Sequence, residues 1–151
     1  MVLIPPFLIY VFAVLHILGA VGWLALNLIN DFGVGKRIAK LSEGALKEYK
    51  AKVDPALTLQ YRIFSGMTIV FGALFAYSFA GGDLSFYSLS NPLGSRILIG
   101  AILGLFAYLL GNTSWFKKPN AYFGRMQLGS LELYVLTATF LFMVAAAHPY
   151  V

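Results

Sequence analysis

Four long apolar stretches, separated by more polar segments, dominate the pattern of this chain. They cover about 7–29, 58–80, 96–115 and 131–148. Each is close to the ~20 residues that an α-helix needs to cross a hydrocarbon core of ~30 Å. Because the segments between them are short, neighbouring helices are expected to run antiparallel. The pattern therefore predicts an all-α integral membrane protein, an antiparallel four-helix bundle formed by residues 1–151 as a single domain.

Local signals predict where these helices begin and end. Pro5-Pro6 suits the start of the first helix, and Asp54-Pro55 suits the start of the second. Gly33 and Gly35 are predicted to end the first helix. In the polar segment that follows, residues 38–49 are predicted to form a short helix on the membrane surface.

Small residues predict the faces on which the second and third helices pack, since they let helix backbones approach closely. In the second span the predicted packing face carries Gly66, Ala73, Ala76 and Ala80. In the third span, which is predicted to open at Arg96, it carries Gly100, Leu103, Ala107 and Gly111.

The composition supports a membrane protein. Hydrophobic residues make up 60% of the chain and charged residues 11%, whereas soluble domains have about 45–50% and 25%. The lipid bilayer is therefore the expected main partner, with further membrane subunits or a homo-oligomer as additional partners. Cysteine is absent, which excludes disulfides, zinc–thiolate sites and thiol catalysis.

The basic residues predict the orientation in the membrane. Six Lys or Arg residues lie between Lys36 and Lys52, and Lys117, Lys118 and Arg125 form a second group. These charges occupy the first and third connections, so they indicate membrane topology and give no support to nucleic-acid binding. The positive-inside rule puts both connections in the cytoplasm and both termini on the non-cytoplasmic side. The predicted location is a cell membrane, crossed several times.

The first span carries an unusual polar stripe. His16, Trp23 and Asn27 are separated by seven and eleven residues, so on a helix they return to within roughly 20° of one another. The small residues Gly19 and Ala20 lie beside them. A histidine in hydrocarbon is costly unless it faces a protein interior and has a partner. The stripe is therefore predicted to face the centre of the bundle.

The fourth span repeats these offsets in Glu132, Thr139 and Met143. His16 and Met143 are predicted to lie at similar depths in the outer half, where an imidazole nitrogen and a thioether sulfur would suit Cu(I) or the two axial positions of a haem. Arg96 would then partner a haem propionate. His148, rotated by about 140° from Met143, would be a third metal ligand at the surface or the entrance.

Structural interpretations of the same residues stay open. His16 could be a packed histidine bonded to a helix carbonyl or hydroxyl, and Met143 could simply fill space in the core. Glu132 and Arg62 lie near predicted span ends, where such side chains extend toward the headgroups. They could also pair with each other near the cytoplasmic face.

Short motifs in three spans resemble the copper-resistance protein D (CopD) family. The first helix of that family has Leu-His, followed seven residues later by Trp and then small residues; the matching residues here are Leu15, His16, Trp23 and Ala25. Its third helix opens with Pro-x-Gly-x-x-Leu, matched by Pro92, Gly94 and Ile97-Leu98. Its fourth has a Glu near the start and a Pro after an aliphatic run, matched by Glu132 and Pro149. The resemblance implies copper handling or haem binding.

A more distant similarity links the chain to HemJ-type protoporphyrinogen oxidases. They share the first-helix histidine and also carry a lysine in the third helix. In this chain Gly100 takes the place of that lysine, with Arg96 one turn earlier. This departure weakens a HemJ-like catalytic role more than it weakens simple metal binding.

Three functions follow as hypotheses. The first is copper binding or transport through a His16–Met143 site, with His148 at the entrance. The second is a haem b protein for electron transfer or porphyrin oxidation, with His16 and Met143 as axial ligands and Arg96 on a propionate. The third is an accessory structural subunit of a larger membrane complex. The sequence does not decide whether the protein is an enzyme.

Overall fold

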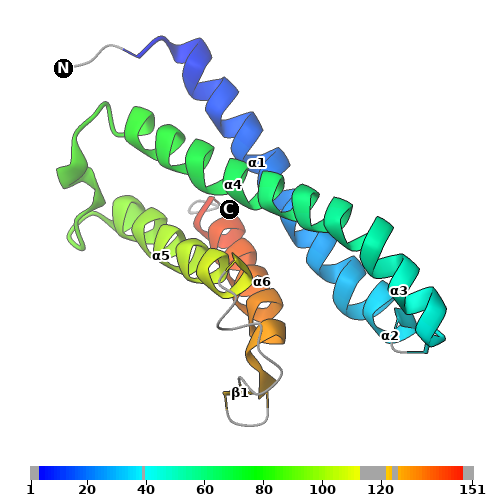
Figure 1. Ribbon diagram of the computed structural model, residues 1–151. Helices are drawn as coiled ribbons and strands as arrows, with labels where there is room; N and C mark the ends of the chain where they lie inside the picture. The colour runs from blue at the N-terminus through cyan, green and yellow to red at the C-terminus, as the bar shows by residue number, and fades with distance from the viewer. Residues whose placement is uncertain (1–3, 39, 113–121, 124–125, 148–151) are drawn as a thin grey trace.

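The computed structural model describes residues 4–38, 40–112, 122–123 and 126–147. Four long helices make up most of it: α1 (Pro6–Leu28), α4 (Asp54–Phe79), α5 (Pro92–Asn112) and α6 (Leu128–Ala147) (Figure 1). Two-residue strands, β1 (Tyr122–Phe123) and β2 (Met126–Gln127), pair antiparallel just before α6. The prediction of an all-α chain is therefore confirmed apart from this small hairpin.

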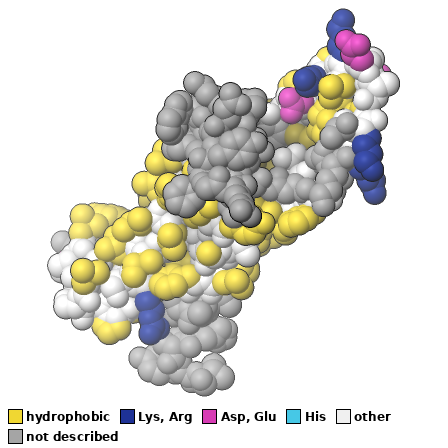
Figure 2. Space-filling model, turned by 90° about the horizontal axis from the view of Figure 1, so that it is seen from below, with side chains coloured by type: hydrophobic (Ala, Val, Ile, Leu, Met, Phe, Trp, Pro, Cys, Tyr) yellow, Lys and Arg dark blue, Asp and Glu magenta, His cyan; other side chains and the backbone are white. Residues whose placement is uncertain are grey.

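Three of these helices, α1, α4 and α5, are long and apolar enough to cross a membrane. In α6 the described apolar part is shorter and covers Leu131–Met143. Large hydrophobic side chains are exposed along the helices, among them Phe7, Tyr10, Ile102 and Leu141. Figure 2 shows such side chains spread over the body of the molecule, with most of the visible charged side chains gathered at one tip. Exposed apolar surface of this extent fits a lipid environment.

The long helices pack in pairs. α1 lies along α4 and α5 lies along α6, while α4 contacts α5 and α1 contacts α6. In Figure 1, α1 and α4 cross each other and the α5–α6 pair lies beside them, in contact with both near the middle of the molecule. This meeting point positions the candidate site.

Helix starts follow the local sequence signals closely. α1 begins at Pro6 and α4 at Asp54, as Pro5-Pro6 and Asp54-Pro55 predict. α5 begins at Pro92, four residues earlier than Arg96, because the Asn91 side chain accepts hydrogen bonds from the backbone N–H groups of Leu93 and Gly94.

The polar segment after α1 differs from the prediction. Helical structure continues beyond Leu28 as a π-helix, Ile29–Val34, and then as α2, Gly35–Ile38. Gly33 and Gly35 do not end the helix, because Gly33 lies within the π-helix and Gly35 is the first residue of α2.

The predicted surface helix in this polar segment exists, shifted toward the C-terminus. It is α3, Glu43–Lys52, and the Ser42 side chain accepts a hydrogen bond from the backbone N–H of Ala45 at its start. A salt bridge of 2.9 Å joins Lys52 to Glu48 on its exposed side.

The packing face of α4 was predicted wrongly. Gly66 faces open space and Ala73 is exposed, whereas Ser65 and Thr68 are buried. Their hydroxyls donate to the carbonyl oxygens of Arg62 and Phe64. Because these internal bonds satisfy the hydroxyl groups, the hydroxyl face can be buried at little cost.

The packing face of α5 agrees with the prediction. Gly100, Ala107 and Gly111 are buried and Leu103 is half-buried. At the other end of the helix Gly94 lies directly against the backbone carbonyl of Phe86, so no side chain fits there.

The connection between α4 and α5 is short and well bonded. Gly81 and Gly82 turn the chain with positive φ, and a 3₁₀ turn, Leu84–Tyr87, follows. Hydrogen bonds from the Ser85 side chain and from its backbone N–H to the Asp83 carboxylate lower the pKa of that exposed carboxyl group. The Tyr87 hydroxyl donates to the Ala76 carbonyl, and burial raises the pKa of the phenol.

Candidate functional site

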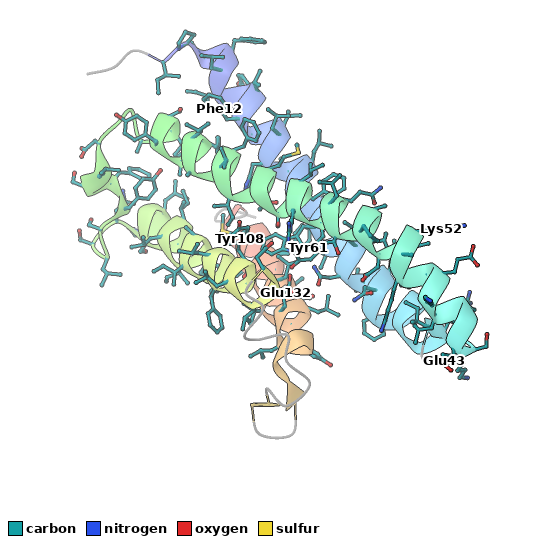
Figure 3. All side chains as sticks on the ribbon, in the orientation of Figure 1. Phe12, Glu43, Lys52, Tyr61, Tyr108 and Glu132 are labelled. Atoms are coloured by element: carbon teal, nitrogen blue, oxygen red, sulfur yellow. The ribbon has the colours of Figure 1, made fainter. Side chains whose placement is uncertain are left out.

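A buried carboxylate lies where the four long helices meet. Glu132, in the second turn of α6, is 4% exposed and is the one charged side chain that is buried in the part of the chain that the structure describes. In Figure 3 its side chain lies among those of Tyr61 from α4 and Tyr108 from α5. Ionisable side chains inside membrane helices are costly and usually functional.

Two donors from α1 hold this carboxylate. The Trp23 indole Nε1–H donates to Glu132 Oε1 at 3.0 Å, and Asn27 Nδ2 reaches the same oxygen at 3.4 Å. Asn27 Nδ2 also donates to the Trp23 carbonyl at 3.0 Å, which fixes the amide. Trp23 is fully buried and Asn27 nearly so. The stripe on α1 therefore does face the interior, and two of its three members meet Glu132.

Aromatic rings enclose the group. Trp23 packs edge-on against Tyr61 and Tyr108, with ring centroids 6.3 and 6.4 Å away. Gly111 of α5 forms the floor, because a Cβ built there would overlap both Tyr61 Oη and Glu132 Oε1. The phenol and the carboxylate thus lie against the same point of α5. We call Trp23, Asn27, Tyr61, Gly111 and Glu132 the carboxylate cluster.

A second polar contact lies beside the cluster. Ser65, one turn after Tyr61 on α4, is fully buried, and Asn112, next to Gly111 on α5, is half-buried. Asn112 Nδ2 lies 3.5 Å from Ser65 Oγ and donates to the Tyr108 carbonyl at 3.1 Å. Ser65 donates to the carbonyl of Arg62, whose side chain is exposed. Polar side chains of α4 and α5 therefore lie next to the cluster.

His16 lies farther along α1 and packs against α4. Its Nδ1 is 2.8 Å from the Thr68 carbonyl oxygen, and a Cβ on Gly72 would come within 2.7 Å of the same nitrogen. A carbonyl oxygen only accepts, so Nδ1 carries the proton and the neutral ring has its lone pair on Nε2. The structural interpretation of His16, a packed ring bonded to a helix carbonyl, is what this geometry shows.

The other predicted ligands lie on different elements. The Met143 thioether of α6 lies over Gly100 of α5, where a Cβ would overlap its sulfur. Arg96 is half-buried near the start of α5, and His148 lies outside the described residues. Among those described, no group of three or more His, Cys, Asp or Glu side chains is placed to hold a metal ion. The pairing of His16 with Met143 at one metal stays a prediction.

The environment of Glu132 differs from the one that the sequence favoured. Glu132 was expected to extend toward the headgroups or to pair with Arg62, but Glu132 is buried and Arg62 is exposed. α6 begins at Leu128, so Glu132 lies a full turn inside the helix. The sequence did contain a signal for its burial. Glu132 is followed by polar or sulfur-containing residues at offsets of seven and eleven, Thr139 and Met143, the same offsets as in the stripe on α1.

Fold and site together define a class: an all-helical protein with helices able to span a membrane and a carboxylate buried at their meeting point. Comparisons with protein-family models, with curated proteins and with solved structures found no match.

Proposed function

We propose that α1, α4, α5 and α6 form an antiparallel bundle that crosses a cell membrane, with both termini on the non-cytoplasmic side. The apolar helices support this arrangement, as does the concentration of Lys and Arg in the connections after α1 and after α5. The carboxylate cluster is built near those same helix ends, so it lies in the cytoplasmic half.

Reporter fusions test this topology. Alkaline phosphatase joined after Val151 should be active in a bacterial host, since the enzyme needs export, whereas green fluorescent protein at the same place should stay dark. The opposite pattern is expected for fusions within 40–52. A fluorescent C-terminal fusion would contradict the proposed orientation.

We infer that the protein handles protons as a membrane transporter, with Glu132 as the group that binds and releases the proton. The single observation that carries this inference is the burial of Glu132 in the bundle, held by Trp23 and Asn27. Carboxylates in such positions commonly form proton relays in pumps and transporters.

The tight packing favours a proton over a larger ion. A methyl group does not fit between Gly111, Tyr61 Oη and Glu132 Oε1, and the Trp23 ring closes the cluster on another side. Among the described side chains, the phenols of Tyr61 from α4 and of Tyr108 from α5 lie beside Glu132 (Figure 3). A proton needs no cavity, because it moves along hydrogen bonds.

Proton movement through the purified full-length protein is the direct test. In liposomes with a pH-sensitive dye inside, an imposed potassium diffusion potential should drive acidification faster than in empty liposomes. Equal rates would reject proton transfer and would favour the accessory subunit.

Metal binding at His16 is the second candidate, and one observation favours it. Metal-ligating histidines usually donate their other ring N–H to a carbonyl or carboxylate, and His16 Nδ1 meets the Thr68 carbonyl in this way. Nε2 of His16 would provide a nitrogen ligand and Met143 a thioether, a pair that suits Cu(I) or haem iron. The resemblance to the CopD family supports the same proposal.

Copper titration of the purified protein tests this candidate. We expect one Cu(I) per chain, and its binding should be lost in His16→Ala. An absorption spectrum of natively purified protein separates copper from haem, because only haem gives a Soret band. Unchanged Cu(I) binding in His16→Ala would exclude His16 as a ligand.

A further inference from the structure

An apolar layer separates the carboxylate cluster from the rest of the bundle interior. One turn beyond Asn27, Gly111 and Glu132, toward the opposite helix ends, lie Trp23, Ala107 and Leu136. All three are buried and form one core cluster, against which Leu24, Phe64, Tyr108 and Val135 pack. We call Trp23, Ala107 and Leu136 the apolar layer.

Polar groups return one turn beyond this layer. On α4 the Thr68 hydroxyl lies against Gly19 of α1, since a Cβ there would be 2.9 Å from Thr68 Oγ1. On α6 Thr139 is buried and donates to the Val135 carbonyl. His16, bonded to the Thr68 carbonyl, belongs to this level. Buried polar groups therefore lie on both sides of the apolar layer.

On the side of the layer that carries the carboxylate cluster, further polar side chains are present. Ser65 and Asn112 lie beside the cluster; Asn112 bonds to Ser65, and Ser65 donates to the Arg62 carbonyl. Buried hydroxyl and amide groups of this kind carry hydrogen bonds, whereas the side chains of Ala107 and Leu136 offer none.

We propose that the apolar layer is a proton-tight gate, and that in this closed form Glu132 exchanges its proton only with the basic-connection side, past Asn112 and Ser65. The inference rests on the proposed proton function and adds the side of the membrane from which the proton reaches Glu132. Hydrophobic constrictions gate membrane pores by excluding water, and the layer is dry by composition. Trp23 has a part in both: its ring lies in the layer and its Nε1–H holds Glu132.

A polar substitution in the layer tests the gate. Leu136→Ser in the reconstituted full-length protein should let protons pass several-fold faster than in wild type under the same potential. Leu141→Ser is the matched control, because Leu141 lies on α6 but is 62% exposed to the lipid side, and it should conduct as wild type does. Ala107→Ser is a second, smaller change in the layer that should also raise the rate.

Substitutions on the access side should act in the opposite direction. Ser65→Ala with Asn112→Leu should slow proton uptake while the pH titration of the Glu132 carboxyl, followed by infrared difference spectroscopy, still reaches completion. If Leu136→Ser and Ala107→Ser both fold, as judged by size-exclusion elution and helical circular dichroism, and conduct as wild type does, the gate is rejected. Absence of any titrating buried carboxyl would instead reject the proton function itself.

Discussion

Replacing Glu132 with glutamine should abolish proton movement through the reconstituted protein while leaving the helices packed. An amide matches the carboxylate in size, and its oxygen can still accept from Trp23 Nε1 and Asn27 Nδ2, which lie 3.0 and 3.4 Å from Glu132 Oε1. It cannot bind and release a proton in the accessible pH range. The expected readout is a rate equal to that of empty liposomes, together with loss of the pH-dependent carboxyl band in the infrared difference spectrum.

Two further variants sharpen this test. Glu43→Gln is the control, because Glu43 is exposed on α3, and it should leave both readouts unchanged. Glu132→Ala should also stop proton movement, but it leaves two buried donors without their acceptor, at about 1–3 kcal/mol for each. The alanine variant should therefore lose thermal stability that the glutamine variant keeps. Proton movement that persists in Glu132→Gln would remove Glu132 from the mechanism.

Replacing Gly111 with alanine should destabilise the packing of the helices, whereas the same change at Gly104 of α5 should not. The added methyl would overlap Tyr61 Oη and Glu132 Oε1, so the α4, α5 and α6 contacts must separate. Overpacking of this kind typically costs about 1–3 kcal/mol. The measurement is the midpoint of thermal unfolding in detergent, followed by circular dichroism.

Gly104 on the same helix provides the control. A Cβ built on Gly104 meets nothing within 4 Å, and alanine favours a helix over glycine by about 1 kcal/mol. Gly104→Ala should therefore match or exceed the stability of wild type. Equal stability of the two alanine variants would mean that Tyr61 and Glu132 do not lie against Gly111.

Part of the candidate site could be predicted from the sequence, namely the residues that α1 contributes to it. The offsets of His16, Trp23 and Asn27 fix a shared face whatever surrounds the helix, and the structure confirms that Trp23 and Asn27 point inward. The same offsets could not say which residues lie opposite. His16 packs on α4 and Met143 on α5, and their pairing at one metal stays a prediction.

Glu132 shows most clearly what could not be predicted from the sequence. A glutamate near the end of an apolar span can reach the headgroups or be buried, and its own neighbours in sequence do not decide between them. The decision comes from Trp23 and Asn27, which lie at the other end of the chain and bring the hydrogen-bond donors. The packing face of α4 was also not decided by its own sequence. Ser65 and Thr68 are buried there, and their hydroxyls donate to carbonyl oxygens of the same helix.

By itself the sequence determined the apolar helices, most of their starting points and the inward stripe on α1, because these depend on hydropathy, proline chemistry and helical periodicity within one segment. Only the tertiary structure decided that a carboxylate is buried where the four long helices meet, that His16 is bonded to α4, and that Trp23, Ala107 and Leu136 form an apolar layer next to the carboxylate. Each of these depends on which faces of separate helices meet, and residues from distant parts of the chain settle that together.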